Sequence, residues 1–220
     1  MPAYSYSAIQ QYQNCPKQYF HERIAKDAPK QPESEQQAEG KRIHKALELR
    51  VKNGKSLPLD LKPLEPIAAK LAGSPGEIYT EMKLAVTEEL KPTGWFEKDV
   101  WFRSVVDLAI VNDKNALIID YKTGKVKEDY SQLLLSAAVL MHYEEEIELV
   151  KAAYVWTSNR KVSPTHLHRD DIMEVWANYL PIINEIEEAT EASEFPAKPS
   201  PLCAWCSITK CSYHPKHGRG

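Results

Sequence analysis

The sequence lacks the features that mark membrane proteins, secreted proteins and nucleotide-driven motors. No segment approaches the roughly 18 consecutive apolar residues of a membrane span, and no basic region followed by an apolar run opens the chain. Neither GxxxxGK(S/T) nor GxGxxG occurs, so nothing indicates an ATP-driven motor or a dinucleotide enzyme. Internal repeats and low-complexity tracts are also absent. We therefore expect a cytoplasmic protein, with any helicase as a separate chain.

An excess of positive charge is missing as well. Lysine and arginine number 28 against 31 aspartates and glutamates, a net charge of −3. A nucleic-acid partner would therefore have to meet a local patch. Residues 41–55 carry six lysines and arginines against one acid, and Lys41, Arg42 and Lys45 lie nearest to His44 in the sequence. This patch is a candidate DNA-binding surface, and the alternative is an ordinary solvated helix face.

The composition that remains is that of a folded α/β domain. The 220 residues are 43% apolar, which suffices for one domain with a sizeable core and not for two. Periodicity predicts helices at residues 5–26, 38–52, 128–142 and 170–189, and strands at 78–86, 95–111, 115–122 and 151–157. We expect a capping box at Ser7 and Gln10 and a kink at Pro181. A helical region (1–60), a core (78–190) and a Cys-rich tail (195–220) then form a single domain, 1–220.

Two aspartates are predicted to meet near the end of a buried hairpin. Residues 112–115, Asn-Asp-Lys-Asn, form a natural tight turn. If Asn112 pairs with Asn115, Asp107 falls directly opposite Asp120. Carboxylates at that separation repel each other unless a cation lies between them, so the hairpin predicts a divalent metal site.

Lys122 and Tyr121 extend this cluster. Because strand side chains alternate, Lys122 projects on the face of Asp120, and the backbone carbonyl of Tyr121 remains available as an oxygen ligand. Oxygen ligands suit Mg²⁺ or Mn²⁺, and a bound metal beside a lysine suits phosphodiester hydrolysis. Asp-x-Lys is also common as a strand-end salt bridge, so the prediction depends on Asp107.

These residues resemble the motifs of the PD-(D/E)XK nuclease superfamily, specifically its RecB-type branch, and the resemblance spans almost the whole chain. The matching segments, in chain order, are Ser7 to Tyr19, Gly40-Lys-Arg-Ile-His44, Tyr79-Thr-Glu81-Met-Lys-Leu84, Val105-Val-Asp107-Leu108 and Ile119-Asp120-Tyr-Lys122-Thr-Gly124. The resemblance implies a central mixed sheet flanked by helices. It implies catalytic roles for Asp107, Asp120, Lys122, Glu81 and Gln132, and metal binding by His44, Asp107, Asp120 and the Tyr121 carbonyl.

Two positions depart from the family pattern. Ser104 stands where a glycine usually precedes the first aspartate, and Ser136 stands where a tyrosine usually follows Gln132 by four residues. The role of that tyrosine is left unfilled or passes to Tyr130 or Tyr143. The departure bears on substrate positioning more than on metal chemistry.

Four cysteines form a second candidate metal site. Cys203, Cys206 and Cys211 offer three thiolates at short spacing, and sulfur ligands select zinc or an iron–sulfur cluster. A fourth ligand from Cys15 would give a 4Fe–4S cluster that clasps the tail to the N-terminal helix, whereas His214 would give a Zn²⁺ site. Similarity to the iron–sulfur branch of the RecB-type nucleases favours the cluster.

The resemblance implies a metal-dependent DNA exonuclease active in recombination, repair or processing, acting on single strands or DNA ends. Its partners would include a separate recombination, helicase or CRISPR adaptation protein in a bacterial, archaeal or phage-infected cell. Trp95, Phe96 and Trp101 are candidates for stacking on unpaired bases, unless they belong to the core. The alternatives are a nuclease-like fold that binds DNA or protein without cutting, and a zinc-binding structural protein.

Overall fold

The computed structural model describes residues 3–217. The chain divides into two compact units, residues 33–176 and a smaller unit made of the segments before Glu33 and after Trp176. No helix within residues 3–217 is both long and apolar enough to cross a bilayer. The single domain over 1–220 stays a prediction, and its residues 1, 2 and 218–220 lie outside the described part.

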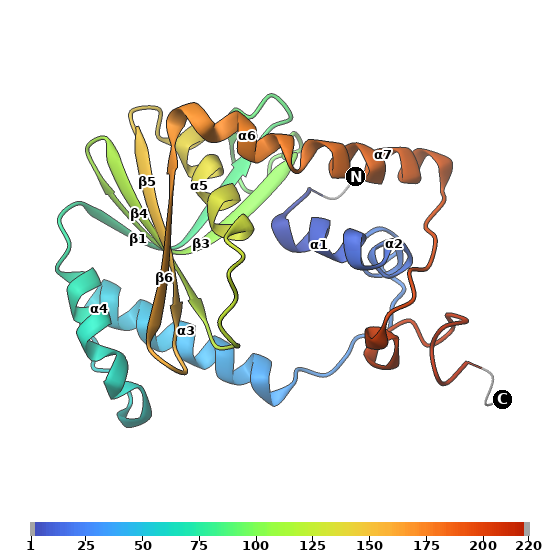
Figure 1. Ribbon diagram of the computed structural model, residues 1–220, viewed down its shortest axis with the longest axis horizontal. Helices are drawn as coiled ribbons and strands as arrows, with labels where there is room; N and C mark the ends of the chain where they lie inside the picture. Colours follow the sequence, from blue (N-terminus) through green and yellow to red (C-terminus); the bar gives the residue numbers. More distant parts are fainter. Residues whose placement is uncertain (1–2, 218–220) are drawn as a thin grey trace. The chain divides into compact units, whose positions relative to one another are not determined.

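The larger unit contains a mixed six-stranded sheet, which confirms the predicted α/β class (Figure 1). The strands are β1 (Glu77–Val86), β2 (Pro92–Thr93), β3 (Phe102–Asn112), β4 (Asn115–Lys122), β5 (Leu149–Trp156) and β6 (Lys161–His168). They lie in the order β2-β1-β3-β4-β5-β6, and only β4 and β5 run parallel. Helix α5 (Ser131–Tyr143) makes the expected crossover between these two parallel strands.

The predicted hairpin register is confirmed. Asn112 pairs with Asn115, and the pairing continues to Leu108 opposite Ile119. Other strand predictions were incomplete. β3 begins only at Phe102 rather than at residue 95, because residues 94–101 belong to the loop after β2.

The short strand β2 and the edge strand β6 were not predicted. β6 is largely polar and contains Pro164, a residue that sheets tolerate at an edge. Its neighbour β5 pairs with it along its whole length. The strand is therefore held by the sheet rather than by a strong hydrophobic pattern of its own.

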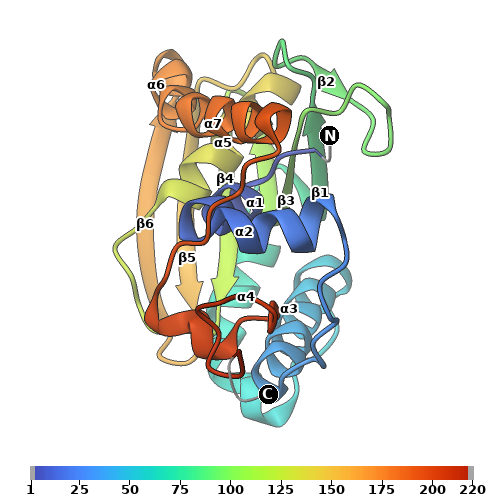
Figure 2. The ribbon, with the colours of Figure 1, turned by 90° about the vertical axis from the view of Figure 1, so that its right-hand side faces the viewer.

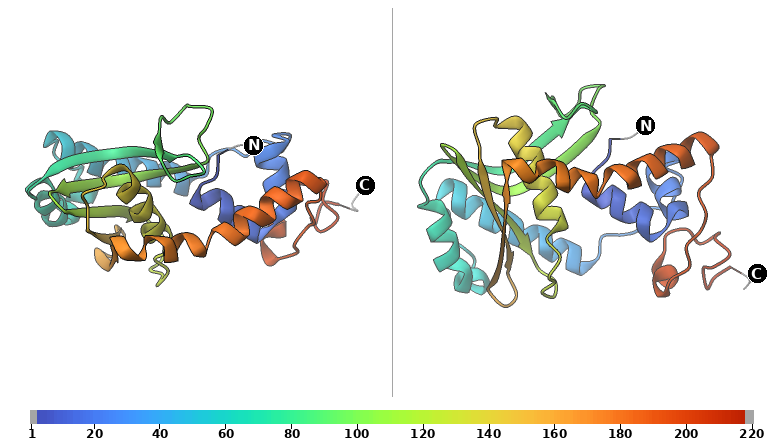
Figure 3. Two further views of the ribbon diagram at one scale, coloured as in Figure 1. Left: turned by 90° about the horizontal axis from the view of Figure 1, so that it is seen from above. Right: turned by 45° about the horizontal axis from the view of Figure 1, so that its top comes forward.

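Helices cover both faces of this sheet (Figure 3). Helix α3 (Glu35–Asn53) and helix α4 (Glu65–Ala72), preceded by a 3₁₀ turn at Leu59–Leu64, lie on one face, and α5 lies on the other. A capping box starts α3: the Ser34 hydroxyl accepts from the Gln37 amide, and the Gln37 side chain accepts from the Ser34 amide. Gly54, with φ of 67°, ends the helix in the left-handed conformation that glycine adopts without strain.

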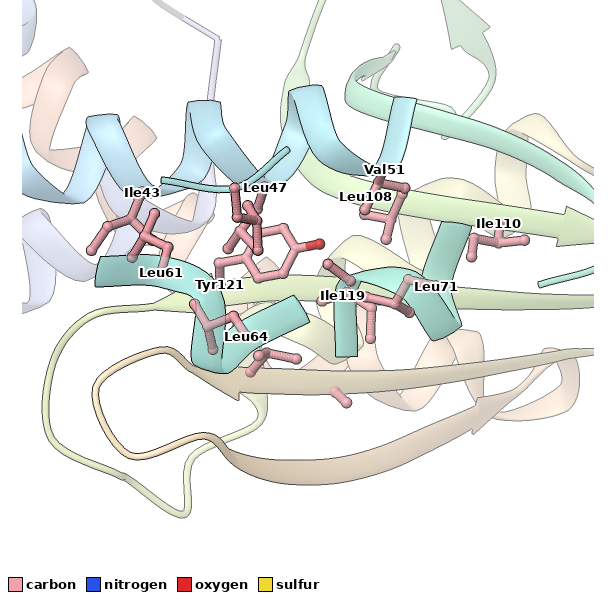
Figure 4. Packing of buried hydrophobic residues seen from close by; sticks show 14 residues of the cluster. Ile43, Leu47, Val51, Leu61, Leu64, Leu71, Leu108, Ile110, Ile119 and Tyr121 are labelled. Carbon is pink, nitrogen blue, oxygen red and sulfur yellow. The ribbon is translucent and has the colours of Figure 1, made fainter. Parts of the chain in front are cut away.

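The core beneath α3 and α4 joins these helices to β3, β4 and β5 (Figure 4). Apolar residues of α3 recur at helical spacing, as Ile43, Leu47 and Val51. They pack with Leu108, Ile110, Ile119 and Tyr121 of the strands. This packing holds α3 along the sheet and thereby fixes the position of His44.

The smaller unit consists of α1 (Tyr6–Asn14), α2 (Pro16–Tyr19), a π-helical turn (Phe20–Ile24), α7 (Leu180–Ala192) and a 3₁₀ turn (Pro201–Trp205), seen in Figure 2. The predicted junction at Cys15 is confirmed, and a turn at residues 178–179, just before Pro181, separates α6 (Ile172–Ala177) from α7. The predicted capping box is wrong. Ser5 caps α1 by accepting from the Ala8 amide at 3.2 Å, because the helix begins one residue before Ser7.

Candidate functional site

Strands β1 and β3 separate locally at Glu81 and Asp107. The pairs Thr80–Leu108 and Met82–Val106 flank this position, but Glu81 and Asp107 do not pair. Glu81 has a φ of 50°, a left-handed value that is unfavourable for a residue with a Cβ and unusual within a strand. Such strain inside a strand is typical of functional sites.

The distortion changes which face the side chains of β3 occupy. Ser104 contacts Ser136 of α5, whereas Leu108 and Ile110 pack with α3 and α4 on the opposite face. Residues four apart in a regular strand share a face, so the alternation shifts by one between Ser104 and Leu108. As a result, the carboxylate of Asp107 faces α3.

Three potential metal ligands meet at this position. Side-chain ligand atoms of His44, Glu81 and Asp107 all lie within 4.8 Å of one another. His44 Nδ1 is 3.3 Å from Asp107 Oδ2, and this contact raises the pKa of His44. Burial and the charge of Asp107 raise the pKa of Glu81. Two acids beside each other carry a negative potential that a divalent cation would relieve.

Asp120 and Lys122 form an adjoining, partly buried pair. Lys122 Nζ lies 2.8 Å from Asp120 Oδ2, donates to Gln132 Oε1 at 2.9 Å, and stands 5.1 Å above the Tyr154 ring. The Asp120 side chain is 14% exposed, and burial raises its pKa to about 6 although Lys122 opposes the rise. The predicted proximity of Asp120, Lys122 and Gln132 is therefore present in the structure.

The structure does not place Asp120 in the same tight group as Asp107. Among the described residues, the group within 4.8 Å contains His44, Glu81 and Asp107 only. The β3–β4 pairing ends at Leu108–Ile119, one position short of Asp107 and Asp120. At that position the Tyr121 amide donates to Asp107 Oδ2 at 2.8 Å instead of to a backbone carbonyl. The predicted register is correct, but the strands have already begun to separate.

A pocket of about 850 Å³ opens over the triad. It is lined by α3 from Gln36 to Glu48, by Glu81 and Asp107, and by Thr123 in the loop after β4. The pocket thus exposes the three potential ligands on a concave surface whose volume is that of a ligand-binding site.

A comparison with known protein families identifies the family of this chain. A model of the PD-(D/E)XK nuclease superfamily matches the chain over residues 3–211. The chain belongs to the PD-(D/E)XK nuclease superfamily. As a member of this superfamily, it has the fold and the acidic site of a metal-dependent nuclease.

Solved structures also resemble this nuclease. One, described as the crystal structure of SSO0001, is 13% identical, covers 97% of this chain and 87% of its own, and superposes with a TM-score of 0.47. No curated protein matches the nuclease sequence.

The two departures from the family pattern contact each other in the nuclease. The Ser104 and Ser136 hydroxyls lie 3.0 Å apart, and Ser136 is buried. The Ser104 side chain of β3, which a glycine would lack, therefore fills part of the space beside Ser136 of α5, where the family pattern has a tyrosine. The hydroxyl of Tyr143, one of the two tyrosines suggested as a replacement, is hydrogen-bonded to the backbone of Ala85 and Thr93.

The basic patch predicted for DNA is already paired with acids. Lys41 lies 2.6 Å from Glu33, Arg42 pairs with Glu39 and Asp60, and Lys45 lies 2.7 Å from Glu48. The sequence count missed most of these partners because they come from outside the 41–55 window. Exposed pairs of this kind are worth about 0–1 kcal/mol, so phosphate can replace the carboxylates.

The four cysteines line one small pocket of the smaller unit. Backbone amides donate to three of the sulfurs: Lys198 to Cys15, Ser200 to Cys203 and Ile208 to Cys206. Burial raises the pKa of Cys206, with contributions from Cys15 and Cys203. His214 borders the same pocket. Within residues 3–217, however, no three of these ligand atoms approach within 4.8 Å of one another.

Proposed function

We propose that this nuclease is a DNA exonuclease that hydrolyses phosphodiester bonds with Mg²⁺ or Mn²⁺. The observation that carries the proposal is the convergence of His44, Glu81 and Asp107 beside the partly buried Asp120–Lys122 pair. The family establishes the nuclease class; the exonuclease mode, the DNA substrate and the choice of metal are proposals supported by the resemblance to RecB-type enzymes.

The donor set fits a divalent cation. Carboxylates suit Mg²⁺ and Mn²⁺, and an imidazole ligand moves the preference towards Mn²⁺. In our proposal His44, Glu81 and Asp107 hold the cation, while Asp120 and the Tyr121 carbonyl complete the oxygen donors. When bound, the cation supplies Lewis-acid stabilisation of charge that develops on the phosphate.

Lys122 has the position of a charge-neutralising and water-orienting group. Its ammonium is held from three sides, by Asp120, by Gln132 and by the face of Tyr154. In the proposed mechanism it donates a hydrogen bond to the attacking water or to a phosphate oxygen. Gln132 fixes the direction of the ammonium, so that little reorganisation is needed during reaction.

The cysteine pocket is proposed to hold a 4Fe–4S cluster through Cys15, Cys203, Cys206 and Cys211. All four cysteines line the same small pocket, so Cys15 can supply the fourth sulfur ligand. His214 borders the pocket as well and would be the fourth ligand of the alternative Zn²⁺ site. The amide donors to three sulfurs add support, because such hydrogen bonds tune cluster sulfurs.

The setting of the activity is also a proposal. Lys41 and Lys45 line the pocket, Arg42 lies between them on α3, and all three are suited to the phosphate backbone. Single strands or DNA ends as substrate, a separate recombination, helicase or CRISPR adaptation protein as partner, and a cytoplasmic location follow from the resemblance.

The test is cleavage of end-labelled single- and double-stranded DNA with Mg²⁺ or Mn²⁺. We expect metal-dependent digestion from the DNA ends. EDTA or the Asp120→Asn substitution should abolish this digestion. Asp113→Asn is the matched control, because Asp113 is exposed in the β3–β4 turn and asparagine tolerates its φ of 49°. If protein with its metal sites loaded digests no DNA substrate, the alternative is favoured: a nuclease-like fold that binds DNA or protein without cutting.

The cluster has its own measurement. Protein purified without oxygen should be brown, with broad visible absorbance that Cys15→Ser removes. A colourless protein containing one zinc per chain would contradict the cluster and favour the Zn²⁺ site.

A further inference from the structure

Two cations of the sheet share one aromatic side chain. Lys83 Nζ lies 5.6 Å, and the guanidinium carbon of Arg103 lies 5.2 Å, from the centre of the Trp95 ring. Neither cation forms an ion pair with any acid of residues 3–217, in contrast to the lysines and arginine of α3 near His44. Their charge is therefore available to a ligand.

The hydrogen-bonding capacity of Arg103 is also unused. Its Nε is buried and has no hydrogen-bond partner among the described residues. A buried donor without a partner is unfavourable unless a ligand or water satisfies it. The guanidinium therefore keeps a charge that no acid of the described residues neutralises, and a phosphate suits such a charge.

These side chains lie on the same face of the sheet as the metal triad. Ser104 faces α5, so its neighbours Arg103 and Val105 point to the other face, where α3 carries His44. Lys83 pairs with Val105 and shares its face. Val105 is 42% exposed, so no helix covers the sheet there.

Phe96 extends this surface into the loop after β2. It follows Trp95 directly and is 86% exposed, an unusual position for a large aromatic side chain. We call Lys83, Arg103, Trp95 and Phe96 the aromatic–basic strip. Along β3, Arg103 is about 14 Å from Asp107, which matches about four nucleotides of a stacked strand.

We propose that the aromatic–basic strip binds single-stranded DNA that continues from the bond held at the metal triad. Lys83 and Arg103 contact phosphates, and Phe96 stacks on an unpaired base. Unpaired cations interleaved with aromatic rings are the pattern of single-strand binding, because every base offers a flat face and every nucleotide a negative charge. A duplex offers no such face, since its bases are already stacked. The inference rests on the proposed function for the direction of the strand.

The test measures binding separately from cleavage. Fluorescence anisotropy with a labelled 12-nucleotide DNA is read in an Asp120→Asn background without added metal. We expect Phe96→Ala to weaken binding by about 5- to 150-fold, the range for one base stack. Lys83→Ala should reduce the slope of log K against log salt by about 0.7, the value for one phosphate contact of a single strand.

Matched controls lie elsewhere on the larger unit. Leu59→Ala removes a side chain that is 88% exposed, and Lys70→Ala removes an exposed charge from α4. Both should bind the 12-nucleotide DNA as the parent does. A blunt duplex should bind the Phe96→Ala and parent proteins equally.

The outcomes separate the strip from the catalytic proposal. If Phe96→Ala and Lys83→Ala bind single strands as tightly as the controls do, the strip is overturned, whether or not the wild-type protein cuts DNA. If both variants lose single-strand binding while the wild-type protein cuts nothing, the strip stands and the proposed catalysis fails.

Discussion

Replacing Asp120 with asparagine is expected to stabilise the metal-free protein at neutral pH. Burial raises the pKa of Asp120 to about 6, from an ordinary value of 3.8. Below about pH 4 the carboxyl is protonated in both the folded and unfolded states and has no effect. As the pH rises towards 6 the unfolded chain ionises first, so stability is lost. The difference of about two pH units corresponds to about 3 kcal/mol. Asparagine keeps the shape without the charge.

The assay is urea unfolding of chelator-treated protein at pH 4 and pH 7.5. We expect Asp120→Asn to raise the free energy of unfolding by about 2–3 kcal/mol at pH 7.5 and by only about 0.5 kcal/mol at pH 4. Asp113→Asn should stay within about 0.5 kcal/mol of the wild type at both values. Adding Mn²⁺ should stabilise the wild type more than Asp120→Asn. A variant less stable than the wild type at pH 7.5 would contradict this prediction and would show that the ion pair with Lys122 outweighs the cost of burial.

Two further predictions concern the faces of α5. Ser136→Tyr should lower the free energy of unfolding by about 1–3 kcal/mol, because the larger ring meets the Ser104 hydroxyl. The double variant with Ser104→Gly should regain part of this stability, as measured by thermal unfolding. Burial and a nearby arginine lower the pKa of His142, whose Nε2 accepts from Trp176 Nε1 at 3.1 Å. The contribution of His142 to stability should therefore be complete above about pH 6.5 and be lost as the pH falls further. In urea unfolding, His142→Gln should flatten that pH dependence. The control His166→Gln, at an exposed position, should leave it unchanged.

Local signals in the sequence were sufficient for much of the sheet. The Asn-Asp-Lys-Asn turn determined the β3–β4 register, because a tight turn fixes which residues pair on either side of it. Edge strand β6 escaped prediction because only Ser163 and Leu167 of it are buried, four positions apart. Because so few of its side chains are buried, β6 shows no strong alternation of apolar and polar residues. Its pairing with β5 holds it in the sheet.

The composition of the site was readable in the sequence as well. Asp120 and Lys122 alternate at the end of a buried strand, and this local geometry holds in the structure. The α3 charges show the limit of such reading, because Glu33 and Asp60 neutralise Lys41 and Arg42 from outside the window that was counted. Net charge over a window says nothing about acids that the fold brings in from elsewhere.

Local patterns were enough to predict helices α3 and α5, strands β1, β4 and β5, the hairpin register and the Asp-x-Lys pair, since each depends on residues close together in the chain. Which ligands meet depends instead on long-range packing. Glu81 carries a left-handed φ without being a glycine, so no sequence signal marks the point where β1 and β3 separate. That separation turns Asp107 towards α3, and the packing of α3 on the strands brings His44 to it. Convergence across 63 residues of chain, from His44 to Asp107, is a property of packing and cannot be expressed as a local pattern.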